Sequence, residues 1–204
     1  GNVATSTNAV EAKQEHWTKW MWNAVATYNF AKDQHRFDAM AGMELNREDD
    51  INFSGYKEDF IILNPDYMWP SAGMGTAQAY GGGEGYSLIS YFGKVNYSYA
   101  DKYLASATIR YDGSSRFGKN NRYATFPSFS LGWRISQEKF MKAKWIDDLK
   151  LRLSVGVTGN AQIGNSEYLQ LYGSTNVDLG NGLRPQVYPS QIANPDLGWE
   201  RNTQ

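Results

Sequence analysis

The stretch Ser90 to Ser136, SYFGKVNYSYADKYLASATIRYDGSSRFGKNNRYATFPSFSLGWRIS, decides the fold. From Tyr103 to Tyr111 the odd-numbered positions are Tyr, Ala, Ala, Ile and Tyr, whereas Ser106, Thr108 and Arg110 lie between them. A period of two places alternate side chains on opposite faces of a β-strand. The stretch therefore predicts strands that have one apolar and one polar face.

The same alternation recurs along the chain. Most of the runs are about 9 residues or longer, which is long for a soluble strand but suits a tilted strand that crosses a bilayer. They cover residues 20–30, 37–45, 91–99, 103–111, 129–135 and 149–157, and a seventh begins near Leu197. The pattern predicts an all-β fold: an antiparallel meander of about six to seven long strands, forming a segment of a large transmembrane β-barrel.

The connections between these runs alternate in length. Residues 31–34, 100–102 and 137–148 form the shorter set, and residues 48–87, 113–121 and 159–196 form the longer set. Bacterial barrels have short periplasmic turns and long external loops, so the longer set is expected outside the cell. Within it, the glycines at 81–83 and 85 are expected to form a flexible tip. We expect residues 1–15 to be a leader or loop segment and residues 16–204 to be a partial barrel.

The composition excludes several classes of function. Twenty Lys and Arg against 21 Asp and Glu leave no basic surface for nucleic acid. Cysteine is absent and histidine occurs twice, which argues against a metal centre, a cofactor site or an enzyme. An aromatic content of 15% beside a mean hydropathy of -0.59 is typical of a barrel with aromatic residues at both membrane interfaces.

Three sets of polar residues are candidate sites, and each has a structural interpretation. Asp112, Ser114, Ser115 and Arg116 lack a partnered histidine, so turn formation is expected in place of catalysis. Glu48, Asp49 and Asp50 are interpreted as a solvated charged run, with Ca²⁺ binding as the alternative. His16 and His35 lie far apart and are interpreted as structural. No catalytic or metal-ligating residue is predicted.

Aromatic residues in the long connections are the candidate ligand-binding residues. Exposed rings can stack on sugar faces or pack against a partner protein, using apolar area with a polar tip. The alternative is that they fasten the loops to the barrel rim. The candidates are Tyr67, Trp69, Tyr80 and Tyr86 in the first long connection, and Tyr168, Tyr172 and Tyr188 in the last.

Three separated motifs resemble one known family in the same order. They are the Ser90–Ser136 stretch with its Asp-Gly-Ser-Ser-Arg-Phe turn at 112–117, WIDDLKLRLSVGVTGNAQIGN at 145–165, and NPDLGWERNTQ at 194–204. Together they resemble the barrel region of SusC/RagA-type TonB-linked outer-membrane transporters. The resemblance is close from Ser90 to Gln204 and looser before it.

The resemblance implies a function in nutrient uptake across the outer membrane of a Gram-negative bacterium. Members of this family carry an N-terminal plug and a TonB box, and they import glycans or peptides with a SusD-like lipoprotein, using energy relayed through TonB. We expect the chain to be a piece of such a protein that lacks the plug and the TonB box. The implied partners are the SusD-like lipoprotein, TonB, outer-membrane lipid and a glycan or peptide substrate.

About six strands are fewer than the eight of the smallest bacterial barrels, so two open sheet edges are expected. Open edges of long strands are pairing sites, and an isolated piece is expected to self-associate. The alternative to the transporter wall is a soluble β-sandwich that binds carbohydrate or protein, because both folds bury one face of each strand.

Overall fold

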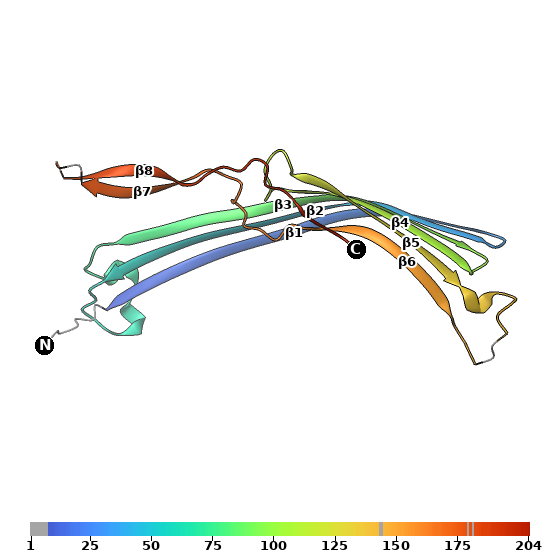
Figure 1. The fold of residues 1–204 in the computed structure, drawn as a ribbon. Coiled ribbons are helices and arrows are strands. Elements are labelled where there is room, and N and C mark those ends of the chain that lie inside the picture. The colour runs from blue at the N-terminus through green and yellow to red at the C-terminus, as the bar shows by residue number, and fades with distance from the viewer. Residues whose placement is uncertain (1–7, 143–144, 179, 181) are drawn as a thin grey trace. The chain divides into compact units, whose positions relative to one another are not determined.

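The computed structural model describes residues 8–142, 145–178, 180 and 182–204, and these residues contain nine β-strands, three short 3₁₀ helices and no α-helix. Seven strands form one antiparallel sheet in the order β1-β2-β3-β4-β5-β6-β9 and two form a separate hairpin, β7-β8 (Figure 1). The strands are β1 Ala9–Lys32, β2 His35–Glu58, β3 Gln78–Tyr99, β4 Tyr103–Ser114, β5 Tyr123–Arg134, β6 Lys150–Asn160, β7 Leu171–Asp178, β8 Leu183–Gln191 and β9 Glu200–Thr203. The predicted all-β antiparallel meander is confirmed.

The chain divides into two compact units, one of residues 1–20 with 48–85 and one of residues 21–47 with 86–204. In the first unit, the 3₁₀ helices η1 Pro65–Tyr67 and η2 Pro70–Ala72 lie in the connection from β2 to β3. Asn8 fastens this connection, because its side chain accepts from the Phe60 amide at 2.6 Å and donates to the Phe60 carbonyl at 3.0 Å. Phe60 is buried there.

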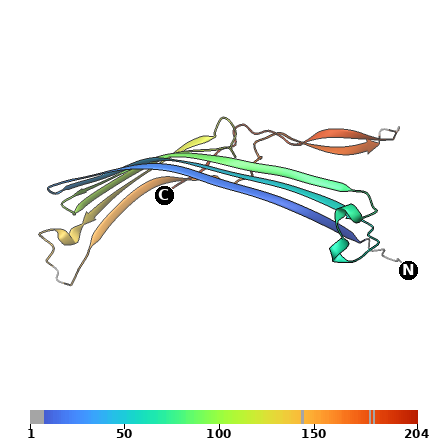
Figure 2. The ribbon, with the colours of Figure 1, turned by 180° about the vertical axis from the view of Figure 1, so that it is seen from behind.

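In the second unit, β4, β5 and β6 run side by side, as both ribbon views show (Figures 1 and 2). The register sorts their side chains into rows. Asn96, Ser106, Ser130 and Ser154 are successive cross-strand partners in one polar row. The next row, one residue along each strand, is apolar and consists of Val95, Ala107, Phe129 and Val155. A slip of one residue in any strand would mix the two faces, so the hydrophobic pattern fixes the register.

The apolar face of this unit is open. Leu153 is 64% exposed, and Ile109, Phe129, Leu151 and Val155 are also exposed. A water-soluble sheet of this size buries such a face against a second layer. These strands therefore present an extended apolar surface, which is the surface that membrane-spanning strands turn to lipid.

The tight-turn end of the second unit carries the short connections. Residues 33–34 join β1 to β2, residues 100–102 join β3 to β4, and the 3₁₀ helix η3 Ile135–Gln137 follows β5. The first two turns touch, because the amide of Ala100 donates to the carbonyl of Gln34 at 2.7 Å. The short connections therefore lie within two residues of their predicted bounds, 31–34, 100–102 and 137–148.

The expected boundaries at 15 and at 48–87 were wrong. Strand β1 begins at Ala9, and residues 48–58 and 78–87 belong to β2 and β3, which leaves residues 59–77 as the connection. The expected flexible glycine tip is part of β3, where a Cβ on Gly85 would lie 2.8 Å from the Glu48 carbonyl oxygen. These strand extensions lose the apolar alternation because a strand with both faces in water has no reason to keep it.

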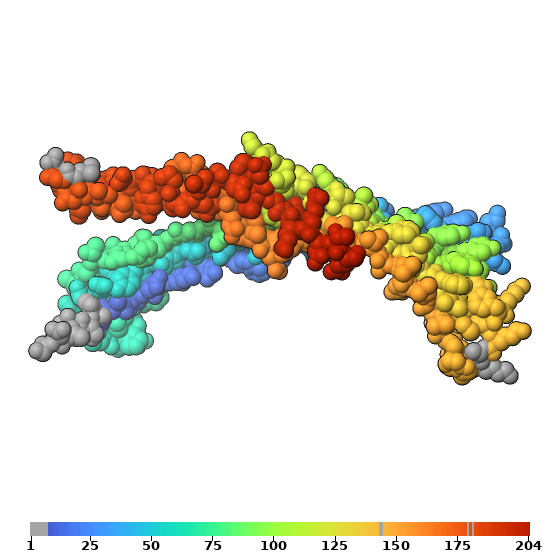
Figure 3. Space-filling view, viewed as in Figure 1, coloured from blue at the N-terminus to red at the C-terminus, as the bar shows by residue number. Residues whose placement is uncertain are grey.

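The expected long loop at 159–196 was also only partly correct. It contains the β7-β8 hairpin, coloured orange-red in Figure 3, and most of the hairpin's side chains are exposed. Pro185 and Pro189 lie in β8. Proline has no backbone N–H to donate to a neighbouring strand, so it is tolerated in a two-stranded ribbon whose outer edges are unpaired. Because proline is rare in strands, its presence prevented the prediction of β8 from the sequence.

Candidate functional site

Several buried side chains of the second unit, including Phe117, Ala124 and Phe126, lie in and beside the β4-β5 connection. Phe117 is fully buried, and its ring lies 4.9 Å from the ring of Trp199. Trp199 also packs edge-on against Phe126 at 5.3 Å, and its indole Nε1 donates to the Arg122 carbonyl at 3.1 Å. Two stretches about 80 residues apart in sequence are thus joined by an aromatic cluster of Phe117, Phe126 and Trp199.

Polar contacts join the same two stretches. The Gly118 amide donates to the Leu197 carbonyl at 2.9 Å, and the Asn120 and Asn121 side chains donate to Asp196 at 2.7 and 2.6 Å. A Cβ on Gly118 would lie 2.1 Å from the Pro195 carbonyl oxygen, so only glycine permits this approach. The connection after β8 is therefore held on the connection after β4.

Arg116 is a second fastening point in these connections. Its guanidinium lies 3.8 Å above the ring of Tyr86, its Nε donates to Asn165 Oδ1 at 2.7 Å, and one of its Nη atoms donates to the Ala161 carbonyl at 3.3 Å. A planar guanidinium can stack and donate at once, which lysine cannot do. Arg116 thus joins three segments that are distant in sequence.

The Asp112–Arg116 segment behaves as the turn that the sequence predicted. Arg110 Nε donates to both carboxylate oxygens of Asp112 at 2.8 Å, and its Nη2 donates to Ser90 at 2.8 Å. Ser115 Oγ accepts from the Ser87 amide at 2.8 Å. Ser90, Asp112 and Ser114 are buried in this arrangement, so these polar groups complete the strand ends and stabilise the polar face.

The predicted ligand-binding aromatics fall into two groups. Tyr67 and Trp69 in the first unit are 63% and 64% exposed, and Tyr80 is exposed with its hydroxyl donating to Gln78. In the second unit, Tyr172 and Tyr188 of the hairpin are exposed. Tyr86 and Tyr168 are half-buried, and Tyr86 already stacks with Arg116.

The two histidines and the acidic run make local contacts within the sheet. His16 contacts Thr18 at 3.1 Å, and His35 Nδ1 lies 2.8 Å from the Tyr97 hydroxyl, with its ring 4.9 Å from that of Tyr99. In the acidic run, Glu48 pairs with Lys19 at 3.2 Å. Across the described residues, no three His, Cys, Asp or Glu side chains are grouped to hold a metal ion. In the same residues, no helix is long and apolar enough to cross a membrane.

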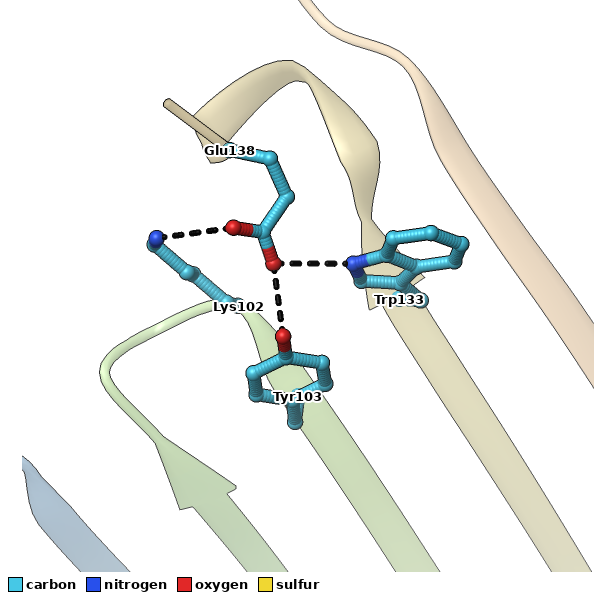
Figure 4. Close-up of polar contacts among 4 residues, drawn as sticks. All are labelled: Lys102, Tyr103, Trp133 and Glu138. Atoms are coloured by element: carbon cyan, nitrogen blue, oxygen red, sulfur yellow. Dashed lines mark hydrogen bonds and ion pairs between the residues drawn. The ribbon is translucent and has the colours of Figure 1, made fainter. Parts of the chain in front are cut away.

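A carboxylate at the tight-turn end collects three donors (Figure 4). The Tyr103 hydroxyl and Trp133 Nε1 both donate to Glu138 Oε1, at 2.7 and 3.1 Å. Lys102 Nζ pairs with Oε2 at 3.1 Å. Aromatic rings that keep their polar tips in water are typical of the membrane interface. The alternation of residue types could not predict this hydrogen-bond network, because Glu138 lies 35 residues from Tyr103 and outside the alternating runs.

The hydrogen bonds from Tyr103, Trp133 and Lys102 lower the pKa of Glu138 below its ordinary value of 4.5. A carboxyl with a lowered pKa in the folded state stabilises the fold above its unfolded pKa, and this contribution is lost as the pH falls through the folded pKa. We expect Glu138→Gln to lower the melting temperature of the detergent-folded protein at neutral pH. The difference from the unsubstituted protein should shrink as the pH falls below 4.5.

Thermal melts followed by circular dichroism across this pH range provide the measurement for Glu138→Gln. Lys139→Gln is the control, because Lys139 is the exposed neighbour of Glu138 and takes no part in the network. A Glu138→Gln melting temperature that stays equally depressed at all pH values would show that the carboxylate's charge is not what stabilises this turn.

An antiparallel meander with one open apolar face and one polar face defines the chain as a stretch of transmembrane β-barrel. The comparisons with known proteins agree. The chain belongs to the TonB dependent receptor-like, beta-barrel family, whose match covers residues 2–204. This is a family of outer-membrane proteins of Gram-negative bacteria that act in nutrient uptake, and the relatives below are named as receptors or transporters, not enzymes.

Three relatives illustrate the similarity. TonB-dependent receptor P39 of Formosa agariphila is 36% identical over 192 residues, which cover 90% of this chain and 17% of that receptor. TonB-dependent receptor SusC of Bacteroides thetaiotaomicron is 44% identical over 122 residues, 57% of this chain and 12% of SusC. The solved structure of the RagAB peptide transporter superposes with a TM-score of 0.87 and 26% identity, covering 98% of this chain and 22% of that one. The chain thus spans less than a quarter of the length of these relatives.

Proposed function

We propose that this chain forms part of the wall and external loops of a TonB-dependent transporter that imports a glycan or a peptide across the outer membrane. The apolar face of β3 to β6 contacts lipid, and the polar face lines a hydrated lumen. The observation that carries this proposal is the register of the second unit, in which whole cross-strand rows are apolar or polar. The exposure of the apolar rows supports lipid contact over the packed interior of a soluble sandwich.

The parent protein is proposed to work with TonB and with a SusD-like lipoprotein, because the similar proteins include SusC and the RagAB peptide transporter. Because bacterial barrels have short periplasmic turns and long external loops, we place the tight turns in the periplasm and the long connections outside the cell. The exposed rings of Tyr67, Trp69, Tyr80 and Tyr172 are proposed to contact the substrate or the lipoprotein. Tyr86 and Tyr168 are proposed to support the loops instead.

The isolated segment is proposed to self-associate. Strand β9 pairs with the end of β6 from Val157 to Asn160, and Gln204 exchanges two backbone hydrogen bonds with Gly156 of β6. Within the described residues, the rest of that edge of β6 and the outer edge of β1 have no neighbouring strand. Unpaired edges of long strands invite pairing with another copy.

Alternating spin labels test the lipid-facing assignment. In full-length receptor reconstituted into proteoliposomes, a label attached to a cysteine at Ala107 is expected to collide more with oxygen, which concentrates in lipid. A label at Ser106 is expected to collide more with a water-soluble nickel complex, because Ser106 belongs to the polar row. Equal accessibility at the two positions, or the reverse order, would contradict the proposed wall.

A further inference from the structure

The β7-β8 hairpin has two outer edges that differ chemically. Within the described residues, neither β7 nor β8 pairs with a third strand, so each strand has one free edge. A free strand edge presents unpaired N–H and C=O groups, to which another strand can add unless the edge is protected. The two edges of the hairpin differ in how many of these groups they keep.

Two prolines remove donors from the outer edge of β8. Pro185 pairs with Asn176, and Pro189 pairs with Tyr172. In an antiparallel ladder, pairs that exchange hydrogen bonds alternate with pairs whose N–H and C=O groups point away from the partner strand. Because proline has no N–H, and because the two prolines are four residues apart, both pairs are of the second kind. Proline thus occupies two outward positions of β8 and protects that edge.

The outer edge of β7 keeps its donors. Tyr172 and Asn176 are the partners of the two prolines, and Ser174 lies between them, opposite Val187. These three residues of β7 are exposed, and each has an N–H and a C=O that point away from β8. Alternate residues of a strand are roughly 7 Å apart. The edge therefore offers a donor and an acceptor at three successive steps of that length.

The hairpin is also held at its base and carries an aromatic surface beside the open edge. The side-chain nitrogen of Gln191 donates to three backbone carbonyls within residues 166–169, at 2.9 to 3.0 Å. The ring of Tyr188 lies over Gly173 of β7, because a Cβ on this glycine would lie 2.8 Å from Tyr188 Cζ. Tyr188 thus reaches from β8 onto β7 and remains 47% exposed. A preorganised edge loses little conformational entropy when a ligand binds.

We propose that the outer edge of β7 binds an extended peptide by strand addition. A polypeptide main chain repeats donors and acceptors at the spacing of this edge, whereas the hydroxyls of a glycan do not. The ring of Tyr188 supplies apolar contact for a side chain of the added strand. The inference rests on the proposed function, which puts this connection outside the cell, and it narrows the substrate to a peptide.

Proline substitutions at two cross-strand partners test the proposal. Ser174→Pro removes an outward donor from the open edge, whereas Val187→Pro removes one from the edge that is already protected. Neither substitution removes a hydrogen bond between β7 and β8, so both should affect the hairpin to a similar extent. The measurement is fluorescence anisotropy on the full-length receptor in detergent, with a fluorescein-labelled heptapeptide of alternating threonine and valine. The same peptide N-methylated at every amide is the control probe.

The heptapeptide should bind the unsubstituted receptor and Val187→Pro alike, and Ser174→Pro about tenfold more weakly, as expected for losing a hydrogen bond of the pairing. The N-methylated probe should not bind, because it cannot donate to a strand edge. Equal binding by the two variants, binding of the N-methylated probe, or no binding to the unsubstituted receptor overturns the proposal.

Light scattering tests whether a second copy of the chain occupies the edge instead. An oligomer that Ser174→Pro dissociates and Val187→Pro does not would overturn the peptide proposal in favour of that occupant. An oligomeric state that both variants leave unchanged agrees with a peptide. The spin labels at 106 and 107 report separately on the wall, so failure of the β7 edge and failure of the proposed function can be told apart.

Discussion

Phe117→Ala is expected to lower the free energy of unfolding of the detergent-folded receptor by about 3 to 5 kcal/mol, the usual cost of removing a buried phenylalanine ring. Phe117 is 0% exposed and packs on Trp199, which in turn packs on Phe126. The substitution leaves a cavity between two segments about 80 residues apart in sequence. The connection after β8 would then lose the apolar contact that holds it against the connection after β4.

Urea titration followed by tryptophan fluorescence measures this change, and limited proteolysis within residues 192–199 reports the release of the connection. Phe53→Ala is the control, because Phe53 is exposed and the same truncation there should change stability by about 0.5 kcal/mol or less. If Phe117→Ala proves no more destabilising than Phe53→Ala, the aromatic cluster is not what fastens these connections.

Ala107→Arg is expected to destabilise the folded receptor in lipid by about 2 to 4 kcal/mol, the cost of a cationic side chain at the middle of a barrel's lipid-facing belt. Ala107 lies midway between Tyr103 and Tyr111 on β4, with Val95 and Phe129 as its cross-strand partners. An arginine there can reach water only by extending past these apolar neighbours.

The matched control for Ala107→Arg is Ser128→Arg, on the polar face of the neighbouring strand, one residue from Phe129. Its new charge should face the lumen and cost little. Folding into bilayers, followed by the heat-dependent shift of the folded band on gels, measures both variants. Equal destabilisation by the two substitutions would remove the distinction between a lipid face and a lumenal face.

The central strands could be predicted because each keeps its alternation for the length of a bilayer. The rows of Ser106 and Ala107 follow directly from that alternation. The outer parts of β2 and β3 could not be predicted, since apolar and polar residues do not alternate throughout residues 48–58 and 78–87. These parts of the strands are continued by backbone hydrogen bonds, which do not require any particular pattern of side chains.

The candidate sites divide in the same way. The turn role of Asp112–Arg116 was predictable from its residue types, but the contacts of Arg116 with Tyr86 and Asn165 were not. The Glu138 network was likewise not predictable, because its members come from two strands and two connections that are separated in the sequence. The exposure of the loop aromatics also depends on the tertiary structure, because the sequence does not distinguish the exposed Tyr67 from the half-buried Tyr86.

The sequence by itself determined that this protein is an antiparallel sheet whose strands have one apolar and one polar face, because the different surroundings of the two faces impose opposite side-chain chemistry on alternate positions. Only the tertiary structure decided which residues meet across the strands. Register and loop packing bring Lys150 opposite Arg134 and Trp199 onto Phe117. Such contacts depend on distances between segments far apart in the chain, which no local period records.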